Sequence, residues 1–127
     1  MLDPGLTVFE QTERFNASHL AEHELKSILN RCLFPYETWD KPCFCLSGGE
    51  KIRLLFCCLM IGNNAPDVFI LDEPMNNLDI QSVEIITAAI KSYRGTVLLI
   101  SHDHYFVKEI KINRSIKLFD TGSVIKI

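Results

Sequence analysis

The chain has 127 residues, enough for about one small domain, and its 47% hydrophobic residues suffice for a packed core. A net charge of −3 gives no basic surface for nucleic acid, and no segment approaches the ~20 apolar residues of a membrane-spanning helix. Asp3 and Glu10 lie where a secretory signal would carry basic residues, and the five cysteines form no C-x-x-C pair. These features predict a cytoplasmic protein with reduced thiols and no membrane insertion.

The first half of the chain has a helical pattern. Apolar residues recur at helical spacing over 18–34, and Pro35 is expected to stop that helix. An irregular segment follows. Ser47 is then a good N-cap, and Glu50 three residues later completes a capping-box pattern. The helix that starts there is expected to end before Gly62.

The second half alternates strands and helices. Residues 68–71 and 96–100 are short apolar runs, typical of strands covered on both faces. Expected helices, each with an aspartate cap, run from Asp79 to about 93 and from Asp103 to about 110, and a hairpin joins 116–119 to 124–127. The order predicts an α/β fold in which a helical subdomain, 1–62, precedes a partly parallel sheet in 63–127.

The turn at Ser47-Gly48-Gly49 has the properties of an anion site. Two adjacent glycines let the backbone approach a phosphate closely, and the helix that follows directs its free N–H groups and positive dipole end toward that phosphate. A capped helix with a flexible entry is the simpler explanation for Ser-Gly-Gly alone. The longer run from Leu46 to Lys51, with Arg53 after it, is more specific.

Acidic and imidazole side chains follow the two predicted strands. Asp72 and Glu73 end the first strand, where open α/β sheets place their ligands. Asp72 suits Mg²⁺, which proteins bind through one or two carboxylates plus phosphates, and Glu73 suits a general base for water. His102 follows the second strand and suits a donor to a γ-phosphate. The alternative is that all three are polar residues at the ends of the strands, where the chain returns to the surface, with no role in catalysis.

A second motif points elsewhere. His19-Leu-Ala-Glu22-His23 matches the H-x-x-E-H pattern of zinc proteases, with both histidines expected on one face of a helix. The other candidate zinc ligands are widely scattered in the sequence. A solvated helical face is the simpler interpretation, and a metallopeptidase is kept as an alternative.

Four motifs in order resemble those of ABC ATPase nucleotide-binding domains. Leu46 to Glu50 is similar to the signature motif, and 68–73 to the Walker B strand with its catalytic glutamate. The segment 76–79 resembles the D-loop, and His102 the switch histidine. Within the superfamily the chain looks most like the ABC-F proteins, tandem ATPases that act on ribosomes in translation or in antibiotic protection. The chain departs from the family's usual residues at Met75, Asn77 and His104.

The resemblance implies a P-loop NTPase-like ABC core without its N-terminal half. No G-x-x-x-x-G-K-[ST] loop occurs in the 127 residues, and the phosphate loop is expected upstream of Met1. The implied cofactors are ATP and Mg²⁺, with Asp72 on Mg²⁺ and with Glu73 and His102 as catalytic residues. Nucleotide-binding roles are implied for Ser47, Gly48, Gly49, Glu50 and Asp79.

The implied partners are a second nucleotide-binding domain, in tandem or as a dimer, and the ribosome. The chain alone is expected to be inactive and, because its strands should have open edges, to self-associate. Two other functions stay open: the ATPase subunit of an ABC transporter, and a non-enzymatic remnant that binds a partner ATPase.

Overall fold

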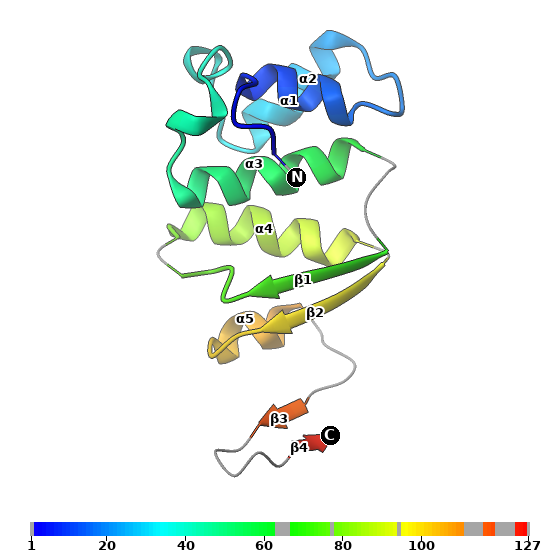
Figure 1. The fold of residues 1–127 in the computed structure, drawn as a ribbon, viewed down its shortest axis with the longest axis vertical. Helices are drawn as coiled ribbons and strands as arrows, with labels where there is room; N and C mark the ends of the chain where they lie inside the picture. The colour runs from blue at the N-terminus through cyan, green and yellow to red at the C-terminus, as the bar shows by residue number, and fades with distance from the viewer. Residues whose placement is uncertain are drawn as a thin grey trace.

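The computed structural model describes residues 2–62, 67–76, 78–93, 95–110, 116–118 and 124–126. The elements are stacked in layers, as Figure 1 shows: α1 and α2, then α3, then α4, then the strands β1 and β2. No helix among the described residues is both long and apolar enough to cross a bilayer.

Two short helices form the outer layer. Helix α1 spans Val8–Phe15 and begins with a capping box between Thr7 and Glu10, although the sequence pattern predicts no separate helix there. Helix α2 spans Glu22–Arg31, so the predicted helix over 18–34 is too long at both ends. His19 and Leu33 have φ of 54° and 65°, in the left-handed region, which an α-helix excludes. The end of α2 therefore comes from the conformation of Leu33, and Pro35 lies beyond it.

Helix α3, Gly48–Ile61, is capped by Ser47 and ends at Gly62, as predicted. Two turns of 3₁₀ helix, Tyr36–Thr38 and Cys43–Cys45, lie in the irregular segment before it. Opposite sides of α3 are buried in different cores, which explains why its sequence is apolar nearly all round.

The first core lies among α1, α2 and α3, and it includes four of the five cysteines, all of which are free thiols. The second core lies between α3, α4, α5 and the two strands. Because α3 contributes Leu54 to the first core and Phe56 to the second, it joins the two parts. The division of the chain at residue 62 stays a prediction.

Strand β1, Val68–Asp72, pairs in parallel with β2, Thr96–Ile100, with Val68 opposite Thr96 and Asp72 opposite Ile100. Helix α4, Ile80–Ser92, connects them. The N-caps predicted for α4 and α5 are confirmed: Asp79 accepts a hydrogen bond from the backbone N–H of Ser82, and Asp103 accepts one from that of Phe106 at the start of α5, His104–Glu109. The hairpin is confirmed in its strands, β3 (Ile116–Leu118) and β4 (Val124–Lys126), while its predicted turn lies outside the described residues.

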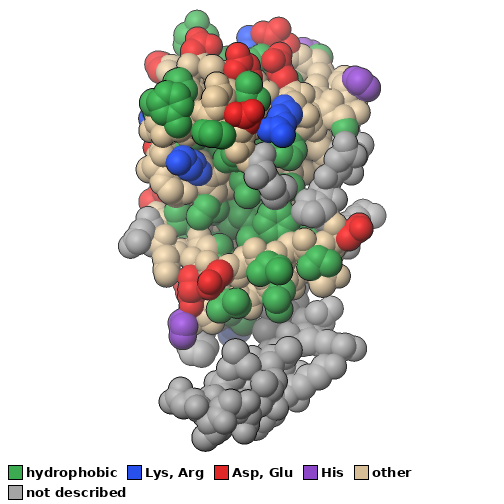
Figure 2. Space-filling model, in the orientation of Figure 1, with side chains coloured by type: hydrophobic (Ala, Val, Ile, Leu, Met, Phe, Trp, Pro, Cys, Tyr) green, Lys and Arg blue, Asp and Glu red, His purple; other side chains and the backbone are tan. Residues whose placement is uncertain are grey.

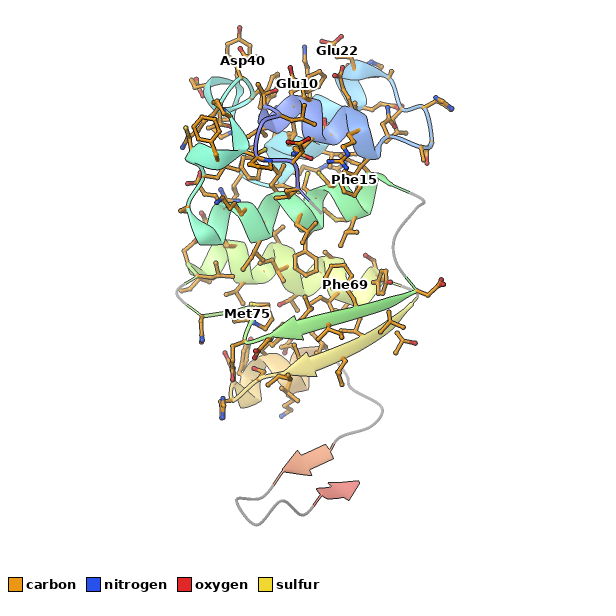
Figure 3. All side chains as sticks on the ribbon, in the orientation of Figure 1. Glu10, Phe15, Glu22, Asp40, Phe69 and Met75 are labelled. Atoms are coloured by element: carbon orange, nitrogen blue, oxygen red, sulfur yellow. The ribbon has the colours of Figure 1, made fainter. Side chains whose placement is uncertain are left out.

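The prediction that both faces of the strands are buried is wrong. Phe69 lies on the side of β1 that faces α4 (Figure 3), and with Leu71 it is 8% exposed. The opposite face carries exposed hydrophobic side chains, at Val68, Ile70, Leu98 and Ile100. Hydrophobic side chains are visible on the surface at the level of the strands in Figure 2. We call these four residues the open sheet face. An apolar run without alternation indicates a strand, but it does not show that both of its sides are covered within the same chain.

Candidate functional site

The turn Ser47-Gly48-Gly49, called the signature turn after the motif that it resembles, forms a capped helix start. The hydroxyl of Ser47 accepts a hydrogen bond from the N–H of Glu50 at 3.2 Å, and the Glu50 carboxylate accepts one from the N–H of Ser47 at 3.2 Å. Burial alone would raise the pKa of Glu50. The hydrogen bonds from Ser47 and the positive charges of Lys41 and Arg53 outweigh burial, so the pKa of Glu50 is lowered from its usual value. Glu50 thus stays ionised and holds the turn, and the N–H groups of Gly48 and Gly49, at the helix start, have no intrahelical acceptor.

The two glycines differ in their surroundings. A Cβ built on Gly48 meets nothing within 4 Å, whereas one built on Gly49 lies 2.6 Å from Cδ2 of Leu78. Gly49 therefore lets the Leu78 side chain pack closely against the start of α3. Gly48 leaves its backbone open to an approaching group, as a phosphate site requires.

Next to this turn lies a polar chain of three side chains. Arg53 donates from Nη1 to the hydroxyl of Ser82 at 2.8 Å, and Ser82 donates that hydroxyl to Asp79 at 2.5 Å. These hydrogen bonds of Ser82, more than the charge of Arg53, lower the pKa of Asp79. Sequence reasoning assigned no role to Ser82 or to Arg53. The spacing Asp79-x-x-Ser82, a cap followed by a polar residue at the third helical position, is the local signal for the first of them.

The signature turn and the segment around Asp79 line one open cavity of about 460 Å³. Its walls come from the start of α3 and from the start of α4 with the residues before it: Ser47, Gly48, Gly49, Glu50, Ile52, Arg53, Asn76, Leu78, Asp79 and Ser82. The structure therefore brings all five predicted nucleotide-binding residues to one place.

The carboxyl ends of the parallel strands hold the second group. Glu73 follows β1, and its N–H donates to the carbonyl of Ile100 at 2.8 Å across the sheet. Nδ1 of His102 contacts Oε1 of Glu73, which brings together two residues 29 positions apart. Glu73 is 24% exposed and His102 95% exposed, and Asp72 beside them is also exposed.

Glu73 has a φ of 44°, which is unusual for a residue with a side chain. Such strain is held by surrounding structure, here by the backbone bond to Ile100 and by the turn in which Asn76 donates to the Glu73 carbonyl at 3.2 Å. Met75 lies in this turn (Figure 3) and packs against the second core. The strained backbone aims the Glu73 side chain at His102.

The two groups lie along one side of the molecule. The starts of α3 and α4 and the carboxyl ends of β1 and β2 all lie at the left of the view in Figure 1. The segment from Glu73 to Asp79 links the groups along the chain. The structure thus has two polar sites on one edge, a cavity at a helix start and an acid–imidazole pair at strand ends.

The zinc-protease pattern does not form the expected geometry. Glu22 begins α2, whereas His19 lies before the helix with its left-handed φ, so the two histidines do not share a helical face. Asn16 holds this loop by hydrogen bonds with both the N–H and the carbonyl of Leu20, each 2.9 Å long. Within the described ranges, no three His, Cys, Asp or Glu side chains lie close enough to hold a metal ion by themselves.

Comparison with known proteins places this geometry in a family. No protein-family model matches the chain. The chain is 46% identical over 99 residues to ABC transporter F family member 2 of Arabidopsis thaliana, covering 78% of this chain and 14% of that protein. It is 42% identical over 120 residues to member 5 of the same plant, covering 94% and 17%. The ATP-binding protein Uup of Escherichia coli K12 is 37% identical over 109 residues, covering 84% and 17%.

The chain belongs to the ABC ATPases, as part of an F-family domain. Solved structures show the same fold. The RNase-L Inhibitor matches with a TM-score of 0.68 and 21% identity over 98% of this chain and 25% of its own. The dimeric ABC transporter cassette MJ0796 matches with a TM-score of 0.63 and 20% identity over 91% and 53%. The predicted fold class, helices followed by a parallel sheet of an ABC core, is confirmed.

The chain spans less than a fifth of the length of these F-family relatives. It covers the part of an ABC domain that holds the signature turn and the strand with the two acids. The roles of the individual site residues remain predictions.

Proposed function

We propose that the protein carrying this chain is an ATPase of the F type, which hydrolyses ATP with Mg²⁺ where two nucleotide-binding domains meet. The contact between Glu73 and His102 is the observation that carries this proposal. It joins a base and a proton donor at the carboxyl ends of two parallel strands, where α/β folds place their ligands. The resemblance assigns the same two residues to catalysis.

The described residues suit both cofactors. Asp72 is an exposed carboxylate directly after β1, an oxygen ligand of the kind that Mg²⁺ prefers. The signature turn has open backbone at Gly48 and two N–H groups without intrahelical acceptors, which suits a phosphate. When bound, ATP would supply the phosphoryl group, and Mg²⁺ would neutralise the negative charge of the phosphates.

The pairing of Glu73 with His102 suits a carboxylate that accepts a hydrogen bond from the imidazole. Nδ1–H of His102 donates to the Glu73 carboxylate, which orients that carboxylate to accept a proton from water. In this arrangement Glu73 serves as the base, and Nε2 is the ring nitrogen that remains for a phosphate oxygen.

We infer that the two sites act on different nucleotides. Glu73, Asp72 and His102 would act on the nucleotide of this domain's own phosphate loop. The signature turn, with Ser47 and Gly48, would act on the nucleotide of the partner domain. Hydrolysis then requires closure of two domains, and the chain alone is expected to hydrolyse no ATP because it supplies only half of each site.

The test is phosphate release by the intact protein that carries this chain. Glu73→Gln should lower the rate about 10²–10⁴-fold, the usual contribution of a general base, while ATP binding persists. The control is Glu84→Gln, at an exposed acid on α4. Full activity in Glu73→Gln would refute the proposal. Phosphate release by the isolated 127-residue chain that is lost in Glu73→Gln would refute the inactivity of that chain.

We further propose a role on the ribosome, in translation or in protection from antibiotics, on the basis of the F-family membership. The Glu73→Gln protein should sediment with ribosomes when ATP is present and not with ADP, because blocked hydrolysis preserves the closed state. Equal recovery with both nucleotides, or none with either, would contradict this role and leave the transporter or remnant alternatives.

A further inference from the structure

The Arg53 side chain on α3 contacts two other segments of the chain. Besides its bond to Ser82 in α4, its Nη2 donates to the carbonyl of Leu33 at 3.3 Å. Its guanidinium carbon lies 4.8 Å from the centroid of the Phe34 ring, within the range of a cation–π contact. A single side chain on α3 thus links the end of α2 to the start of α4.

Two hydrogen bonds link Arg53 to Asp79 through Ser82, and their donors and acceptors can be arranged in only one way. Arginine has donors and no acceptor, so the hydroxyl of Ser82 must accept from Arg53. Its one proton then goes to Asp79, at 2.5 Å. Because Ser82 is 1% exposed, water does not compete for this hydroxyl. The side chain and backbone N–H of Ser82 both bind the Asp79 carboxylate, so Arg53 controls the orientation of the cap of α4.

The same two elements also meet at Gly49 and Leu78, where a Cβ would lie at 2.6 Å. The signature turn and the residues before α4 are therefore joined at two points, one apolar and one through Arg53. Two contacts on the same pair of elements prevent rotation as well as separation. Among the described residues, Arg53 makes the only hydrogen bond from a charged side chain between the start of α3 and the start of α4, and its loss removes that bond.

We propose that Arg53 is a positioning residue that holds the Asp79 segment in register with the signature turn, so that both meet a partner domain as one rigid unit. This inference rests on the proposed function for its effect on activity. Arg53 touches neither Glu73 nor His102 in the described hydrogen bonds, so it acts on closure and not on the proton transfer itself.

The first experiment needs no activity. Amide hydrogen exchange is compared in the intact protein that carries this chain and in its Arg53→Met, Arg53→Lys and Arg31→Met variants. Methionine keeps apolar contact with Phe34 but has no donors, lysine restores one charge and one donor, and Arg31 is an exposed arginine on α2. Exchange over 79–83 should rise about tenfold or more in Arg53→Met, less in Arg53→Lys, and stay unchanged in Arg31→Met. Unchanged exchange in Arg53→Met would overturn the proposal.

The second experiment separates positioning from stability. In Arg53→Met, kcat for ATP should fall at least about tenfold with KM within twofold, and Arg53→Lys should recover part of it. Ser82→Ala should lower kcat similarly, and the double variant should be no worse than Arg53→Met, because both act through one chain of bonds. Additive losses, or a change confined to KM, would overturn the proposal. A protein whose rate is indifferent to Glu73→Gln would instead refute the proposed function and leave the exchange result standing.

Discussion

The adjacent glycines of the signature turn make a matched pair of perturbations. They are neighbours at the start of α3, yet a methyl group on Gly48 enters open space and one on Gly49 meets Leu78. Gly48→Ala and Gly49→Ala therefore change the same chemistry in the same turn. Only the second tests the close approach of α3 to the segment before α4.

The magnitudes follow from the two environments. A glycine-to-alanine change at a compatible position stabilises a protein by about 0.4–1 kcal/mol, because the unfolded chain has less freedom to lose. Gly48→Ala should gain this amount. Gly49→Ala gains the same but loses about 1–3 kcal/mol to overpacking, since the 2.6 Å contact forces the Leu78 side chain to move. The two variants should thus differ by about 1–3 kcal/mol, with Gly49→Ala the less stable.

Urea unfolding of the chain at low concentration, followed by the fluorescence of its single tryptophan, Trp39, measures this difference. Adding Leu78→Ala to Gly49→Ala removes the clash, so the double variant should be more stable than the sum of the single effects. Equal stabilisation by both glycine variants would show that Gly49 and Leu78 do not pack closely. In the intact protein, Gly48→Ala should lower the proposed ATP hydrolysis despite its higher stability, because Gly48 lines the cavity where we propose that the partner domain's nucleotide binds.

Three further predictions concern the caps and the open sheet face. Ser47→Ala should cost about 1 kcal/mol of unfolding free energy through loss of the cap, whereas Ser27→Ala, at an exposed position on α2, should change it by less than about 0.5 kcal/mol. The lowered folded-state pKa of Asp79 means that its contribution is complete above the unfolded pKa of about 3.9 and is lost as pH falls through the folded value. Asp79→Asn should therefore flatten the acid limb of an unfolding titration, and an unchanged limb would contradict this. On the open sheet face, Ile70→Lys with Leu98→Lys should reduce self-association in light scattering, and a monodisperse wild-type monomer would refute that expectation.

Predictions from local sequence were accurate where the structure is held by bonds between near neighbours. The caps at Ser47, Asp79 and Asp103 are all confirmed, since each joins a side chain to a backbone N–H three residues on. The bounds of α2 were wrong because a left-handed residue such as Leu33 leaves no trace in apolar periodicity. Pro35 was expected to end this helix, but α2 already ends at Arg31, four residues earlier.

The composition of the candidate sites was readable from the sequence, and their assembly was not. The acids after β1, the histidine after β2 and the glycines before α3 are visible as residue types at strand and helix ends. The contact of Glu73 with His102 depends on the parallel register of β1 and β2, which places residues 29 positions apart at one edge. The bond from Arg53 to Ser82 likewise joins α3 to α4 through tertiary packing.

Local sequence was enough to predict α3, α4, α5, the strands, the caps and the family resemblance, because these depend on side chains a few residues apart or on motifs in linear order. Three features required the folded chain: the closeness of Gly49 to Leu78, the hydrogen bonds of Ser82 and the exposure of one sheet face. Each of these depends on which distant surfaces meet. Burial and close approach are properties of a pair of surfaces, and the pattern of one segment describes only its own side.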